Sequence, residues 1–203
     1  MAKTLTQYVC QNCGRTTPRM MGRCPQCGEY NTMIEVVVEK PTAASRRTLG
    51  AAPRSKPRRL SEIEADTLER MPMPLGEFAR VLGGGMVPGS VVLVSGDPGI
   101  GKSTLLLQVA GAMRGPVLYV SGEESAQQIK MRADRLGLHA DDLYLVNETN
   151  LESILAHVEA VQPRLLVIDS IQTTYTDELT ASAGSVSQVR ECASHLQALA
   201  KSS

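Results

Sequence analysis

The residues best suited to chemistry form one run, Gly96-Asp97-Pro98-Gly99-Ile100-Gly101-Lys102-Ser103-Thr104. This run matches the phosphate-binding pattern G-x-x-x-x-G-K-[ST]. Its glycines allow the backbone to turn tightly and to bring N–H groups close to phosphate oxygens. In such a loop the lysine reaches the outer phosphates, and the serine hydroxyl can bind Mg²⁺. The run therefore predicts a site for a nucleoside triphosphate, which all nine residues help to form.

The segments on either side of this loop must position it. Residues 91–95, Val-Val-Leu-Val-Ser, predict a buried strand, and the apolar residues 105–110 predict a helix that packs on a core. A helix that begins near Lys102 would direct its N-terminal dipole at a bound anion. The alternative is a chance glycine-rich turn, but a strand before it and a helix after it argue against chance.

Strand-like and helix-like segments alternate along the rest of the chain. Strands are predicted at residues 117–121, 143–146 and 165–169, and helices at about 125–136, 150–161 and 186–200. Thr149 and Glu152 have the spacing of a capping box at the start of the second helix. This alternation predicts an α/β fold with a mostly parallel sheet that helices cover on both faces.

Acidic residues follow two of the predicted strands, and the carboxyl ends of parallel strands are where ligands bind. Asp169 ends an apolar strand, and we expect it to help Ser103 hold Mg²⁺. Glu123 and Glu124 follow the strand at 117–121, where a carboxylate could activate the water that attacks a γ-phosphate. The alternative is that this pair only favours the N-terminus of the next helix.

Two Cys-x-x-Cys pairs, Cys10 with Cys13 and Cys24 with Cys27, lie near the N-terminus. Four thiolates in this spacing favour tetrahedral Zn²⁺ in a closed structural site, which would not take part in catalysis. A redox dithiol and an iron–sulfur site are the alternatives. Because about 35 residues cannot bury a sufficient core alone, we expect the metal to supply much of the stability of this segment.

Charge is distributed unevenly along the 203 residues, although the net charge is zero. Residues 1–59 contain 11 Lys and Arg against 3 Asp and Glu, whereas the remainder contains 10 against 18. Two interpretations explain this asymmetry equally well. The N-terminal part could contact a polyanion, or its basic residues could form a soluble tether. No apolar run could span a membrane and no secretory signal is present, so we expect a cytoplasmic protein without membrane contact.

Composition also predicts three parts. Residues 1–38 form the four-cysteine zinc module, residues 39–60 form a basic flexible linker, and residues 61–203 form the nucleotide-binding domain. The linker is rich in Pro, Ala, Ser, Arg and Lys, and such a segment buries too little apolar surface to order itself.

Several stretches resemble the RadA family of bacterial DNA-repair proteins, which are RecA-like ATPases. They are residues 82–104, residues 119–125 (Tyr-Val-Ser-Gly-Glu-Glu-Ser), residues 169–173 (Asp-Ser-Ile-Gln-Thr), and the four-cysteine head with its basic linker. The resemblance implies a RecA-like P-loop core and an ATP hydrolase of recombinational repair that promotes branch migration and strand exchange. It implies Glu123 as the acid that activates water, with Lys102 as the second catalytic residue.

The same resemblance implies partners. These are single-stranded or branched DNA, a RecA-type recombinase and a replicative helicase, with a hexameric ring as the assembly of the full-length protein. Residues 173–185, which include Tyr175, would be either a DNA-contacting loop or an ordinary mobile loop.

RadA-family chains continue beyond Ser203 with a strand that bears a polar sensor residue, a Lys-Asn-Arg-Phe-Gly motif and a domain that resembles Lon protease. We therefore expect a truncated chain with an incomplete ATPase domain, in which nucleotide binding is retained and hydrolysis is weak or lost. The alternative functions are a nucleotide-gated binding module, or a scaffold whose zinc head docks a protein partner without DNA-stimulated hydrolysis.

Overall fold

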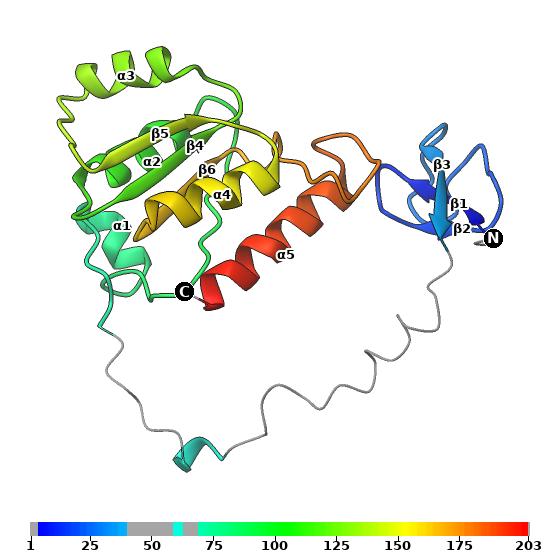
Figure 1. Ribbon diagram of the computed structural model, residues 1–203, viewed down its shortest axis with the longest axis horizontal. Helices are drawn as coiled ribbons and strands as arrows, with labels where there is room; N and C mark the ends of the chain where they lie inside the picture. Colours follow the sequence, from blue (N-terminus) through cyan, green and yellow to red (C-terminus); the bar gives the residue numbers. More distant parts are fainter. Residues whose placement is uncertain (1–3, 40–58, 63–68, 203) are drawn as a thin grey trace. The chain divides into compact units, whose positions relative to one another are not determined.

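The computed structural model describes residues 4–39, 59–62 and 69–202 (Figure 1). The chain divides into two compact units, Met1–Leu68 and Glu69–Ser203. Of the predicted linker, residues 39–60, the structure describes Glu39, which ends a strand, and residues 59 and 60. The short 3₁₀ helix η2, Leu60–Glu62, begins at the last of these. Among the helices of the described stretches, none is long and apolar enough to cross a membrane.

The N-terminal unit contains a small antiparallel sheet of order β2-β1-β3. Its strands are β1 (Thr4–Cys10), β2 (Thr16–Thr17) and β3 (Met33–Glu39). The two long strands pair over their whole length, from Thr4 opposite Glu39 to Cys10 opposite Met33. In the described part of this unit, Met33 and two cysteines are the buried members of the core cluster. A metal held by the cysteines would add stability to a unit of so few residues.

The C-terminal unit is built on a parallel sheet of order β5-β4-β6. The central strand β4 (Val117–Ser121) is buried along its entire length, as the apolar run predicts. It lies between β5 (Leu143–Asn147) and β6 (Leu165–Asp169). The register places Ser121 opposite both Asn147 and Asp169, so the carboxyl ends of all three strands lie at one edge of the sheet.

Helices cover both faces of this sheet, which confirms the predicted layering (Figure 1). One apolar cluster joins β4 and β6 to α2 (Lys102–Ala112), α3 (Ala126–Arg135) and the short helix α1 (Gly76–Val81). The other face of the same strands packs against α4 (Leu151–Val161). The last helix, α5 (Val186–Ser202), buries Gln188 and Cys192.

The predicted strand at residues 91–95 is wrong. This segment has no strand assignment, and Val91 and Leu93 expose 57% and 79% of their surface. A strand exists only through its ladder of hydrogen bonds to a neighbour. Both sides of β4 are already taken by β5 and β6, and no strand of the described residues pairs with residues 91–95. High β-propensity alone therefore did not make a strand here.

The predicted capping box of Thr149 and Glu152 is also wrong. Asn150 caps α4 instead, and its side chain accepts a hydrogen bond from the Ser153 N–H at 2.9 Å. The Thr149 backbone is already engaged, because its carbonyl accepts a hydrogen bond from the Tyr175 N–H at 2.9 Å. Asparagine is as good an N-cap as threonine, so the contact of Tyr175 with the Thr149 backbone decides which of the two residues caps α4.

The segment that follows β6 is anchored rather than loose over much of its length. Gln188 is 1% exposed, and its amide bonds four backbone groups of residues 176–181 at 2.9 to 3.2 Å. Thr174 and Thr176 are buried as well. A buried amide with all of its hydrogen bonds made fixes the backbone that it contacts. Residues 176–181 are therefore tied to α5, and both expectations for the segment, DNA contact through Tyr175 and mobility, stay predictions.

Candidate functional site

The phosphate-loop motif lies at the same edge of the sheet as the strand ends. Helix α2 begins at Lys102 and has 11 residues, so it is about 16 Å long. Four residues join its C-terminus to the start of β4, so α2 runs antiparallel to that strand on the sheet face. Its N-terminus therefore lies towards the carboxyl edge of the sheet. Gly101 precedes the helix with φ of 101°, a conformation that side chains other than glycine rarely adopt.

The lysine of the motif closes the loop from inside. Its Nζ donates to the carbonyl oxygens of Gly96 at 2.9 Å and of Asp97 at 2.8 Å. An ammonium group has three donors, so one remains for a phosphate oxygen. Residues 96–101 are exposed, whereas Ser103 and Thr104 are half-buried in the first turn of α2. The loop is thus open to a ligand, and the Lys102 ammonium group lies against the backbone of the loop.

The structure brings Glu123 and Asp169 together at the ends of neighbouring strands. The Gly122 N–H donates to the Asp169 carbonyl at 3.0 Å, which extends the β4–β6 ladder by one step. Immediately beyond it, the exposed Glu123 accepts a hydrogen bond at Oε1 from the Ser170 hydroxyl at 3.1 Å. A Cβ at residue 122 would collide with Thr173, so a glycine is needed where these two strand ends meet.

The two neighbouring glutamates have different surroundings. Glu124 forms an ion pair with Arg132 of α3, and both side chains are largely covered. Glu123 has no ion pair within the described residues. A carboxylate that is already neutralised by a guanidinium is a poorer base than a free one. Glu123 is therefore the better placed of the two to act on a ligand.

Sequence reasoning missed the residues that fix this turn. The Ser121 hydroxyl accepts from the Glu124 N–H at 3.0 Å, and the Asn147 side chain accepts from the Ala126 N–H at 2.9 Å. These polar side chains stand at the ends of β4 and β5, so they hold the Glu123 backbone to the sheet. A polar residue that closes an apolar strand is the signal that could have found them.

A second missed residue is Tyr119, in the middle of β4. Its hydroxyl donates to Asp169 Oδ2 at 2.7 Å. Burial, followed by this hydrogen bond, raises the pKa of Tyr119 above its ordinary value. The signal in the sequence is one phenol in an otherwise apolar strand, because a buried tyrosine hydroxyl usually has a partner.

The four cysteines of the N-terminal unit converge as predicted. The Sγ atoms of Cys10 and Cys27 are 3.6 Å apart, those of Cys13 and Cys24 are 3.5 Å apart, and all four lie within 4.8 Å of one another. A tetrahedral Zn²⁺ with bonds of about 2.3 Å would hold its sulfurs about 3.8 Å apart. The four residues therefore fit a tetrahedral metal ion.

Both halves of this cluster have the same backbone. The N–H of Gly14 donates to the Cys10 carbonyl at 2.8 Å, and the N–H of Gly28 donates to the Cys24 carbonyl at 3.0 Å. Both glycines have positive φ, a backbone conformation that glycine adopts without strain. Each Cys-x-x-Cys pair thus forms the same type of turn, and each turn directs two sulfurs toward the centre of the cluster.

The pKa values of the neighbouring thiols differ widely. Burial raises the pKa of Cys10, but hydrogen bonds from Thr32 and from the backbone outweigh it and lower this pKa to about 6. A hydrogen bond from the Arg15 backbone lowers the pKa of Cys13, but burial and the neighbouring thiols raise it to about 12. Four sulfurs this close cannot all ionise without a cation, so the donor set calls for a metal.

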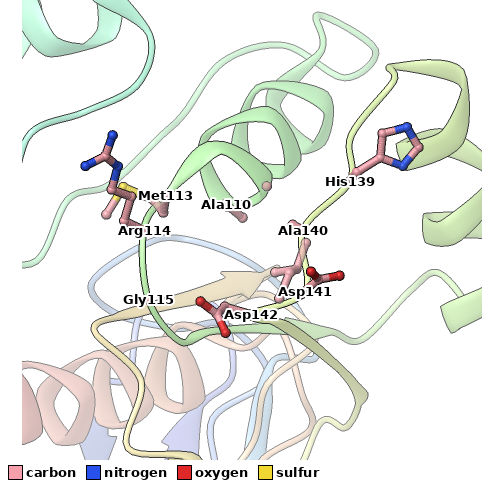
Figure 2. A pocket seen from close by; sticks show the side chains of 10 residues that line it. Ala110, Met113, Arg114, Gly115, His139, Ala140, Asp141 and Asp142 are labelled. Carbon is pink, nitrogen blue, oxygen red and sulfur yellow. The ribbon is translucent and has the colours of Figure 1, made fainter.

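A pocket of about 280 Å³ lies elsewhere, at the C-terminal end of α2 and in the loop before β5 (Figure 2). Its lining includes Arg114, His139, Asp141 and Asp142. This is the opposite end of the helix from the phosphate-loop motif, about 15 Å away by helix length. The pocket is therefore separate from the candidate nucleotide site.

Known proteins resemble both units. The model of the AAA domain family matches residues 56–202, and the model of the rubredoxin metal binding domain matches residues 8–35. The DNA repair protein RadA of Bacillus subtilis is 48% identical over 206 residues, which cover 99% of this chain and 45% of that relative.

Two further RadA proteins give the same result. That of Streptococcus pyogenes serotype M6 is 48% identical over 203 residues, with 99% of this chain and 45% of the relative covered. That of Listeria monocytogenes is 48% identical over 204 residues, with 98% and 44% covered. The chain thus spans less than half the length of the curated relatives that it matches. With the phosphate-loop motif and the parallel sheet described above, the match over residues 56–202 shows that this chain belongs to the AAA domain family.

Proposed function

We propose that this chain is the nucleotide-binding part of an ATP hydrolase that acts on DNA in recombinational repair. The observation that carries the proposal is the arrangement of three segments: Asp169 ends β6, Glu123 follows the neighbouring strand β4, and α2, which begins with the phosphate loop, packs on the face of the same sheet. Parallel sheets bind their ligands at the carboxyl ends of their strands. The names of the RadA relatives support repair as the process.

Each residue of the site has a proposed role. The backbone of residues 96–101 and the Lys102 ammonium bind the phosphates of ATP, at the N-terminus of α2. Ser103 and Asp169 hold Mg²⁺, which when bound neutralises phosphate charge. Glu123 takes the proton of the attacking water as general base, because its carboxylate is exposed and forms no ion pair with the residues that the structure describes.

The four cysteines hold a structural Zn²⁺ in this proposal. Because all four positions of a tetrahedral ion are filled by sulfur, no site is left for a substrate or water. The metal therefore stabilises the head and takes no part in hydrolysis. Residues 1–38 form this module, residues 39–60 a linker, and residues 61–203 the ATPase domain.

The head also supplies a surface for a polyanion. Three exposed arginines lie between the two Cys-x-x-Cys pairs: Arg15, Arg19 and Arg23. Arg23 also donates to the Gly28 carbonyl at 2.8 Å, so it has a structural task as well. We propose that this surface contacts single-stranded or branched DNA during branch migration and strand exchange. A RecA-type recombinase, a replicative helicase and a hexameric ring belong to the proposal for the longer protein.

The proposal is tested by the binding of a fluorescent single-stranded oligonucleotide, followed by anisotropy at several salt concentrations with and without Mg²⁺ and ATP. We expect the affinity to fall with a constant slope in log[salt] and to rise with ATP. Arg15→Ala with Arg19→Ala should reduce the slope by about 1.4, because each lost phosphate contact removes about 0.7. Lys102→Ala should abolish the rise in DNA affinity with ATP and leave the dependence on salt unchanged. Affinity that ignores ATP and both arginines would refute the DNA part of the proposal.

A further inference from the structure

We propose that Tyr119 is a positioning residue for Asp169: its buried hydroxyl holds one carboxylate oxygen in place and leaves the other for the magnesium ion. The inference rests on the proposed function, because it assigns to Asp169 the task of holding Mg²⁺ beside the phosphate loop. It adds a residue from a different strand, which never touches the nucleotide, to the machinery of the site.

The sheet register explains how the two residues meet. Tyr119 of β4 pairs with Val167 of β6. Asp169 lies two residues further along β6, and residues two apart point to the same face of a sheet. Diagonal neighbours of this kind are about 7–8 Å apart, which an aromatic side chain can span. The tyrosine thus lies along the sheet face, and its hydroxyl reaches Asp169 Oδ2 at 2.7 Å.

The hydroxyl and the carboxylate depend on each other. Tyr119 is 1% exposed, and its ring packs in the apolar cluster that includes Leu107 and Ile129. Within the described part of the chain, Asp169 Oδ2 is the one hydrogen-bond acceptor of this hydroxyl. That carboxylate in turn accepts no other hydrogen bond from the described residues. One oxygen of Asp169 is therefore fixed by the protein, and the other keeps its lone pairs for a cation.

The rigid surroundings make this hydrogen bond a means of orientation. A fully buried ring in a central strand has little freedom to move, so it sets the rotamer of the acid at the strand end. Groups that orient a metal-binding side chain typically change metal affinity by about 10–100-fold when they are lost. Without the hydroxyl, the Asp169 side chain can turn away and must be reordered whenever Mg²⁺ binds.

The test is a Mg²⁺ titration of the binding of a fluorescent ATP analogue to the whole chain, started in EDTA. For Tyr119→Phe, which keeps the ring, we expect the Mg²⁺ midpoint to rise about 10-fold, while nucleotide affinity in EDTA stays as in the parent chain. Tyr144→Phe is the control for loss of a tyrosine hydroxyl from the same sheet, because Tyr144 is 48% exposed and lies on β5, which β4 separates from the strand of Asp169. It should behave as the parent chain does.

A double variant separates positioning from general loosening of the fold. In an Asp169→Ala background, Tyr119→Phe should have no further effect on the Mg²⁺ midpoint, since the residue acts through that carboxylate. An unchanged midpoint for Tyr119→Phe alone would overturn the inference and leave the nucleotide site standing. Equal losses in EDTA and in Mg²⁺ would also overturn it, because they indicate a damaged fold. If the parent chain binds no nucleotide at all, the proposed function fails and this inference fails with it.

Discussion

Removal of the metal from the four-cysteine head is expected to unfold β1 and β3 and to leave the C-terminal unit folded. The two strands pair along their full length, and among the described side chains the apolar cluster at their end consists of Met33, Tyr8 and the four cysteines. Structural zinc contributes roughly 10–16 kcal/mol in small zinc-binding peptides, far more than such a core can supply. Hydrogen exchange of the whole chain, with and without a chelator, measures this effect strand by strand.

Cys10→Ser should reproduce the effect of the chelator, because Cys10 lies at the end of β1 and supplies one of the four sulfurs. Cys192→Ser is the matched control, since Cys192 is equally buried but lies on α5, outside the cluster. Metal analysis should give one zinc per chain for the control and none for Cys10→Ser. Strands β1 and β3 that stay protected in the chelator would contradict the account, and bound iron in place of zinc would refute the proposed metal.

The second large effect is expected at the glutamate pair. Glu123→Gln should lower the rate of ATP hydrolysis by about 10²–10⁴-fold, the usual contribution of a general base. Glu124→Gln should change the rate much less, because Glu124 is held by Arg132, whereas Glu123 is the residue that Ser170 contacts. Its main effect should be a lower melting temperature, from the loss of a partly buried ion pair.

Single-turnover hydrolysis of labelled ATP, with protein in excess, measures both variants even when turnover is slow. Nucleotide affinity measured in parallel shows whether a loss arises in binding or in chemistry, since a lost base should leave affinity nearly unchanged. A greater loss of rate in Glu124→Gln than in Glu123→Gln would reverse the assignment of the two residues.

Much of the fold could be predicted from local patterns. Strands 117–121 and 165–169 begin as continuous apolar runs, and α3, α4 and α5 show a clear apolar periodicity. The convergence of the four cysteines was predictable, because the spacing of two Cys-x-x-Cys pairs is typical of a shared metal site. In each case the signal lies within a few residues of the chain.

Features that depend on distant partners were not predictable. Residues 91–95 have the composition of a strand, yet they pair with no strand of the described residues. The cap of α4 moved from Thr149 to Asn150, because Tyr175 engages the backbone of the former. The hydrogen bond between Tyr119 and Asp169 joins residues 50 positions apart, and the sheet register alone brings them together.

The claim on which the rest depends is that the phosphate loop on α2 binds a nucleoside triphosphate together with Mg²⁺. Isothermal titration of the zinc-loaded chain with ATP and Mg²⁺ measures this directly. We predict one site per chain, weaker binding in EDTA, and at least a 10-fold loss of affinity in Lys102→Ala, whose ammonium lies at the centre of the loop. A folded, zinc-loaded chain that releases no heat with ATP or ADP, or a Lys102→Ala variant that binds both as well as the parent, would contradict the account.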